Sequence, residues 1–190
     1  MPSIDVDDEI GGIRLTGTID EVYRGSGQVL VQFSRLRRRS ELSAWVHHVL
    51  LQCFAPAGMP RTARLVGRQP SDGREIEIGF HDLDDPRALL GELLDLYREG
   101  TTRPLPLFAS TSRTYAESVA KRQPPEKAAE RARGTYRAEY PGWGDGFDPY
   151  NVLAFAGADP FADAPAGEPS FASVALRVFG PLLEHREARE

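Results

Sequence analysis

Four arginines stand within five positions of the chain, and this spacing suits contact with a run of phosphates. Each guanidinium group stays charged and pairs with phosphate oxygens through a planar fork of donors. A solvated surface, or salt bridges to acidic neighbours such as Glu41, explains the same run without any ligand. The candidate DNA-contact residues are Arg35, Arg37, Arg38 and Arg39.

A second group of residues has the composition of a metal-binding loop, because His81, Asp82, Asp84 and Asp85 lie within five positions. The last two aspartates directly precede Pro86, and carboxylates at that place are typical of the start of a helix. We therefore expect a helix cap here and no metal site. Sequence motifs of nucleotide-phosphate loops, dinucleotide-binding turns, serine hydrolases and zinc proteases do not occur in the chain.

Two β-hairpins are predicted to position these residues. Segments 13–23 and 28–34 alternate apolar and polar side chains around the turn RGSG, which predicts an antiparallel pair. Segments 62–69 and 74–80 flank the turn PSDG and predict a second pair. Arg64 and Arg68 share one face of this second hairpin and are further candidates for nucleic-acid contact.

Helices are predicted to cover the sheet. Apolar residues recur at helical spacing over 40–54, with Ser40 as the expected N-cap, and over 86–99. His47 and His48 are adjacent on the first helix and face different directions, so we expect core or surface histidines. This order predicts an α+β (mixed α/β) fold with a central sheet flanked by helices. Further helices are predicted over 112–121, over 125–139 and from about 170 onward.

The composition limits the classes of function. The chain has 190 residues, 41% of them hydrophobic, and these values predict one compact domain over 1–190. Within it we expect a tail over 1–12 and an irregular loop over 140–170. The net charge of −5 argues against a domain that nucleic acid surrounds on all sides, so any DNA contact must be local.

The compartment is also predicted from composition. The acidic N-terminus MPSIDVDDEI lacks the basic and apolar regions of a signal peptide, and no apolar run is long enough to span a membrane. Cys53 is the single cysteine, so the chain can form neither an intrachain disulfide nor a thiolate metal cluster. We therefore expect a cytoplasmic protein without a cofactor.

The first predicted hairpin resembles the core of the PD-(D/E)xK nucleases. In that family an aspartate ends one strand, and an acidic residue with a lysine two positions later lies on the next strand. The carboxylates hold Mg²⁺ against the scissile phosphate, and the lysine acts beside the attacking water. Here Asp20 takes the first place, but Gln32 and Ser34 stand where the acid and the lysine belong. The resemblance therefore implies a decayed site, and we assign no catalytic residue and no metal ligand.

Four blocks of the sequence carry a second resemblance: 11–20 with 28–53, then 93–112, 127–150 and 178–185. In this order they resemble the C-terminal domain of exodeoxyribonuclease V gamma subunits, the RecC family. The resemblance implies a PD-(D/E)xK fold without nuclease chemistry that assembles with a RecB-like subunit and, as a further candidate, a RecD-like subunit. It also implies DNA guiding near the point where a duplex is split, in double-strand-break repair by homologous recombination.

Two other functions stay open at this point. One is an active Mg²⁺-dependent nuclease that uses Asp20 with an acid or lysine from elsewhere, and the other is an interaction scaffold without DNA contact. Segment 140–170 is crowded with large apolar residues, which predicts a docking surface for a partner. Packing of the same residues onto the chain's own core is the alternative. The residues are Phe147, Tyr150, Leu153, Phe155 and Phe161.

Overall fold

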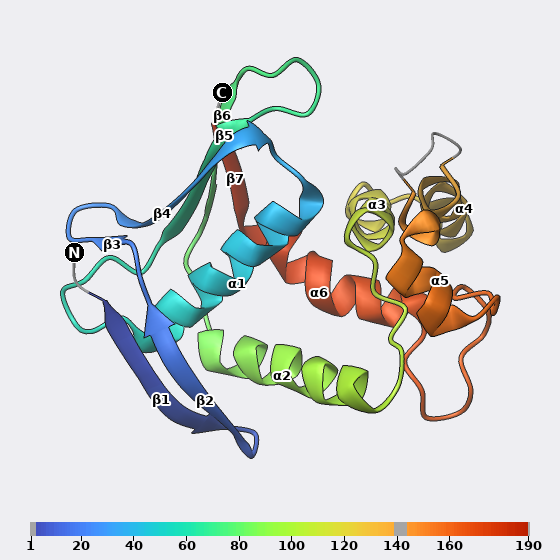
Figure 1. The fold of residues 1–190 in the computed structure, drawn as a ribbon, viewed down its shortest axis with the longest axis horizontal. Coiled ribbons are helices and arrows are strands. Elements are labelled where there is room, and N and C mark those ends of the chain that lie inside the picture. The colour runs from blue at the N-terminus through green and yellow to red at the C-terminus, as the bar shows by residue number, and fades with distance from the viewer. Residues whose placement is uncertain (1–2, 139–143, 190) are drawn as a thin grey trace. The chain divides into compact units, whose positions relative to one another are not determined.

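The computed structural model describes residues 3–138 and 144–189. Their contacts group the chain into two compact units: unit 1 comprises Met1–Leu96 with His185–Glu190, and unit 2 comprises Tyr97–Glu184. Helices and strands together make the α+β class that the sequence predicted (Figure 1). The single-domain organisation stays a prediction, and the two units are described separately.

Unit 1 is built on a five-stranded sheet in which the strands follow chain order from β3 to β7. Strand β4 runs parallel to β5, and every other neighbouring pair is antiparallel. The strands are β3 (Val22–Tyr23), β4 (Gly27–Arg35), β5 (Ala63–Arg68), β6 (Glu75–Phe80) and β7 (Arg186–Arg189). The predicted second hairpin is confirmed as β5 and β6, whereas β7 was not predicted.

Helix α1 (Arg38–Phe54) connects the parallel strands β4 and β5 and packs on β5 and β6 (Figure 1). Parallel neighbours cannot be joined by a tight turn, so a crossover of this kind is required. Trp45 and Val49 of the helix are fully buried, and each such side chain contributes roughly 1.5–3 kcal/mol by leaving water. Ala63 and Leu65 of β5 are buried as well.

The predicted N-cap of α1 was wrong. The helix begins at Arg38, its N-cap is Arg37, and Ser40 lies within the first turn. The reason is the sheet: the amide of Leu36 donates to Arg68 O at 2.8 Å, so the chain leaves β4 and enters the helix within two residues.

The predicted pairing of 13–23 with 28–34 was wrong except at β3, whose two residues pair with Gly27 and Gln28 of β4. Strand β2 (Ile13–Ile19) instead pairs with β1 (Ile4–Ile10) in a separate two-stranded sheet. The predicted tail over 1–12 is therefore wrong over β1. Gly11 and Gly12 both have positive φ, 58° and 76°, as the tight hairpin turn between these strands demands.

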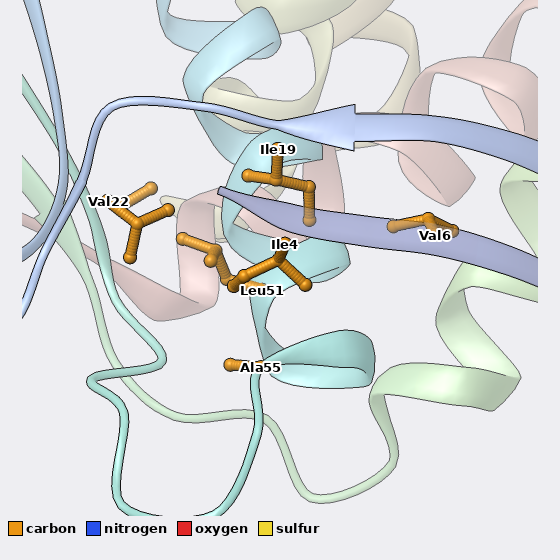
Figure 2. Close-up of a cluster of buried hydrophobic side chains, with 7 residues drawn as sticks. Ile4, Val6, Ile19, Val22, Leu51 and Ala55 are labelled. Atoms are coloured by element: carbon orange, nitrogen blue, oxygen red, sulfur yellow. The ribbon is translucent and has the colours of Figure 1, made fainter. Parts of the chain in front are cut away.

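The β1–β2 hairpin is held by an apolar cluster shared with α1. Ile4 and Ile19 are directly opposite each other in the register, and both are buried. Figure 2 shows their side chains near Leu51, with Val22 beside them. The cluster explains why this hairpin packs against the C-terminal end of α1 rather than extending the central sheet. Its buried members are Ile4, Val6, Ile19, Val22, Leu51, Ala55 and Ala63.

Helix α2 (Pro86–Thr102) begins where the acidic run predicted a cap, because the amide of Ala88 donates to Asp85 Oδ1 at 3.0 Å. It continues three residues beyond the predicted end at 99. The first turns of α2 meet β1 rather than the central sheet on which we expected the helix. Arg87 Nη1 bonds Asp8 Oδ2 at 2.8 Å, and Gly91 lies against Ile10.

Unit 2 is helical and packs around Phe108. The ring of Phe108 lies 5.0 Å from that of Tyr136, 5.4 Å from Phe155 and 6.4 Å from Phe171. Its helices are α3 (Ala109–Ala120), α4 (Pro125–Tyr136), α5 (Pro149–Phe155) and α6 (Phe171–His185), with a 3₁₀ turn at Asp145–Phe147. None of the described helices has the length and apolar character to cross a membrane.

Segment 140–170 is less irregular than predicted, although residues 139–143 lie outside the described part of the chain. Asp145 Oδ2 accepts hydrogen bonds from the amides of Ser110 and Thr111 at 3.1 and 2.7 Å, which ties the segment to the start of α3. Asp148 caps α5 by accepting from the amide of Tyr150. Asp-Pro is a common helix start, so this signal was present in the sequence.

The sequence left two alternatives for the five large apolar residues of this segment: exposure as a docking surface, or packing onto the chain's own core. Each alternative holds for some of the five. Phe155 and Phe161 pack against the core of unit 2. Phe147, Tyr150 and Leu153 are exposed at 56%, 82% and 80%. An exposed apolar surface is therefore present on and beside α5, but it is smaller than predicted.

His48 of α1 is buried in the core of unit 1 and contacts the start of β5 and the residue that follows β6. Its Nε2 bonds the carbonyl of His81 at 3.0 Å, so Nε2 is the donor. The amide of Ala63 donates to Nδ1 at 3.3 Å, which requires an unprotonated Nδ1. The ring is therefore neutral, and burial lowers the pKa of His48 to about 4.

We expect the protein to lose stability as the pH falls from about 6.5 toward 4. In that window the unfolded chain protonates His48 while the folded chain does not, so the unfolded state is favoured by up to about 3 kcal/mol. Urea unfolding at pH 7 and about pH 4.5 measures the loss. His48→Gln keeps a donor and an acceptor but cannot titrate, so its loss should be smaller. Equal losses in both proteins would contradict the assignment.

Candidate nucleic-acid interface

The four candidate arginines lie where β4 ends and α1 begins. Arg35 is the last residue of β4, Arg37 is the N-cap of α1, and Arg38 and Arg39 start the helix. All four are exposed. From Val31 to Arg39 the chain contains no acidic residue, so the positive charge here is local, in a chain whose net charge is −5.

Arg35 and Arg38 each have a partner that orients the guanidinium group. Arg35 Nη1 donates to the carbonyl of Pro70 at 3.2 Å. Arg38 Nη1 lies 3.9 Å from Glu41 Oε2, so the salt bridge that the sequence offered as an alternative to DNA contact exists at this arginine. Glu41 is buried and also accepts a hydrogen bond from Arg186 Nε of β7. Glu41 therefore ties the start of α1 to the far edge of the sheet.

Arg68 extends the cluster from a distant part of the sequence. It is exposed and stands opposite Arg35 in the β4–β5 register. The sequence identified Arg68 as a candidate but could not show this proximity, since α1 separates the two strands. Arg64 behaves differently: its guanidinium bonds Glu77 Oε1 at 3.3 Å on the neighbouring strand.

A β-bulge separates Arg35 from the regular part of β4. Val31 pairs with Val66 and Arg35 pairs with Arg68, so three residues of β4 lie against the single residue Gly67. Gly67 is required there, because a Cβ would come within 2.4 Å of a Leu36 methyl group. Bulges redirect the side chains that they carry.

Phe33, within the bulge, is exposed to solvent. Its side chain is 89% exposed, and that of Val31 is 58% exposed. Both residues line a surface hollow of about 470 Å³ together with Val66 and Arg68. The sequence did not single out Phe33, because alternation alone does not show which face of the strand is left uncovered. The interface therefore comprises Phe33, Val31, Arg68 and the four candidate arginines, and we call it the β4–α1 surface.

The residues that resemble a nuclease site are not assembled into one. Asp20 is exposed between β2 and β3, and its carbonyl accepts a hydrogen bond from Gln28 Nε2 at 2.8 Å. Gln32 lies four residues beyond Gln28 on β4, which is about 13 Å at the usual rise of a strand. Gln32 Nε2 donates to Ser34 Oγ at 2.8 Å and to the carbonyl of Arg35 at 3.1 Å.

These contacts give Gln32 and Ser34 a structural role within the bulge. The amide of Gln28 is likewise engaged, since His47 Nδ1 lies 3.1 Å from its Oε1. In the described residues, no group of three or more histidine, cysteine, aspartate or glutamate side chains could hold a metal ion.

Comparison with known proteins points to one family. The family model described as RecC C-terminal domain matches residues 1–120. The chain is 33% identical over 190 residues to the RecBCD enzyme subunit RecC of two Mycobacterium tuberculosis strains, covering 94% of this chain and 17% of each relative. It is 35% identical over 130 residues to the RecC subunit of Mycolicibacterium smegmatis, covering 66% of this chain and 11% of that protein. The chain therefore spans less than a fifth of these relatives.

We expect Glu41→Ala to destabilise the protein by about 2–4 kcal/mol, because it removes a buried carboxylate that binds the partly buried Arg186. Glu77→Ala is the matched control, since the pair of Glu77 with Arg64 is more exposed and worth less than about 1 kcal/mol. Urea unfolding of both variants gives the comparison. A loss for Glu41→Ala no larger than that of the control would show that Glu41 does not hold the sheet to α1.

Proposed function

Since the chain belongs to the RecC C-terminal domain family, we propose that it is a non-catalytic, nuclease-like module that guides DNA in a helicase–nuclease complex. The complex would act in the cytoplasm in double-strand-break repair by homologous recombination. The observation that carries the proposal is the exposed β4–α1 surface, where arginine charge gathers without nearby nuclease chemistry. Its partners would be a RecB-like subunit and, as a further candidate, a RecD-like subunit.

The charge distribution supports guiding rather than enclosing DNA. A polyanion is repelled by most of a surface with a net charge of −5, and is attracted where the arginines gather. Such contact is independent of sequence, because phosphates carry no base information. A strand or duplex that passes through a complex needs this kind of contact, since it must slide and not be held at one site.

The contacts of Gln32 and Ser34 support a role without catalysis. A nuclease of this class needs carboxylates gathered around a divalent cation, and a cation beside the attacking water. Gln32 supplies only an amide, which is bonded to Ser34 and to Arg35 O. In the described residues, the carboxylate of Asp20 belongs to no group of three or more side chains that could hold a metal ion.

The exposed apolar residues of α5 support assembly with another subunit. Tyr150 and Leu153 are more than three-quarters exposed, and Phe147 and Val152 are more than half exposed. Exposed apolar groups of this density are typical of surfaces that another protein covers. An interaction scaffold without DNA contact would use the same surface, so DNA binding is what separates the two functions.

We expect the chain to bind single-stranded and duplex DNA weakly, with an affinity that falls steeply with salt. Arg35, Arg37 and Arg39 are replaced together by alanine, while Arg38 is kept because it pairs with Glu41. The slope of log affinity against log salt should fall by roughly 0.7–0.9 for each phosphate contact that is lost. Fluorescence anisotropy across about 50–200 mM NaCl measures it.

The control for this experiment removes equal charge elsewhere. Lys121, Lys127 and Arg131 are exposed on and near α4, and their joint replacement by alanine should leave the slope unchanged. An equal loss in both variants would mean that net charge, and not the β4–α1 surface, determines binding. Wild-type chain that binds no DNA would favour the scaffold function.

We expect the purified chain to cleave neither linear duplex nor single-stranded DNA when Mg²⁺ or Mn²⁺ is added. One carboxylate without a second acid or a lysine should gather the metal poorly and leave the developing charge unstabilised. A cleavage assay that compares the wild type with Asp20→Ala tests whether the chain has nuclease activity that depends on Asp20. Cleavage that disappears with this single substitution would establish the nuclease alternative.

A further inference from the structure

Phe33 stands out because it is a large apolar side chain held almost entirely in water. At 89% exposure it gains nothing from the core, and it lies within the bulged part of a strand and not in a loop. Bulges of this kind are specific features that turn a side chain toward a task. The contacts of Gln32 with Ser34 and Arg35 O brace the bulge from within.

The surroundings of Phe33 determine what it would meet. Arg35 follows it by two residues, and Arg68 stands opposite Arg35 on the neighbouring strand. Val31 and Val66 pair with each other and line the same hollow, which Glu75, opposite Arg68 on β6, also lines. Arg35 and Arg68 outnumber this one carboxylate, and an exposed ring beside such cations suits a flat apolar group attached to a polyanion.

We infer that Phe33 is a stacking platform for an unpaired base, so that the β4–α1 surface prefers single-stranded over duplex nucleic acid. This rests on the proposed DNA-guiding function and names its substrate class. Bases in a duplex present their faces to each other, whereas unpaired bases offer a face to an aromatic ring. The arginines hold the backbone, Phe33 receives a base, and the preference is independent of sequence because every base has a flat face.

The substitutions at Phe33 separate stacking from other contacts. The full chain is titrated against a labelled oligothymidylate of about twenty nucleotides and against a blunt duplex. Phe33→Ala should weaken oligothymidylate binding by about fivefold or more and leave duplex binding unchanged. Phe33→Trp should retain the affinity, and Phe33→Leu should lose it, because leucine is apolar but cannot stack. Phe33 is exposed, so the melting temperature of each variant should match that of the wild type.

Tyr97→Ala is the matched control, since Tyr97 is an exposed aromatic residue that belongs neither to the β4–α1 surface nor to the apolar surface on and beside α5. Unchanged oligothymidylate binding in Phe33→Ala, with binding lost in the triple arginine variant, overturns the stacking role and leaves the proposed function intact. Full affinity in Phe33→Leu overturns it in favour of simple apolar contact. Loss of a co-purified helicase subunit in Phe33→Ala, with DNA binding unchanged, assigns the surface to protein contact. Failure of the wild type to bind either DNA overturns both proposals.

Discussion

The parallel pairing of β4 with β5 is the constraint on which unit 1 depends. It obliges the chain to leave the sheet at Arg35, cross over one face as α1 and return at Ala63. The crossover buries Trp45, His48 and Val49 and leaves the bulged end of β4 in solvent. It also concentrates arginines at the point of departure, where a strand end and a helix start are two residues apart. The core and the β4–α1 surface are thus two results of one topological requirement.

Patterns of neighbouring residues predicted the strands and helices that depend mainly on residues close in sequence. The Asp72–Gly73 turn and the alternation on either side of it were enough for β5 and β6, and helical spacing was enough for α1 and α2. The first hairpin failed because the polar residues between Ile4 and Ile10 made β1 look like an acidic tail. Strand β7 has no apolar alternation at all, and it is a strand only because β6 offers it an edge. Such contacts depend on partners distant in sequence, which no local pattern contains.

The candidate site also has features that the sequence shows and features that only the fold shows. Arg35, Arg37, Arg38 and Arg39 are contiguous, so their clustering was evident from the sequence. The proximity of Arg68 depends on register, and the exposure of Phe33 depends on which face of β4 other elements cover, so neither was evident. The nuclease-like spacing of Asp20, Gln32 and Ser34 is incomplete in the sequence itself, and the absence of catalysis stays a prediction. That Gln32 and Ser34 bond each other is a property of the folded strand that spacing alone does not contain.

The position of β7 has a consequence for how the protein is made. Unit 1 is discontinuous: its final strand follows the whole of unit 2 in the chain. A ribosome adds about 5–20 residues per second, so β6 waits on the order of ten seconds for its neighbour. During that interval the edge of β6 is unpaired and the buried carboxylate of Glu41 lacks Arg186. Unit 2 is continuous and can fold before β7 is made, and the edge of β6 needs protection from edge-to-edge association until β7 pairs with it.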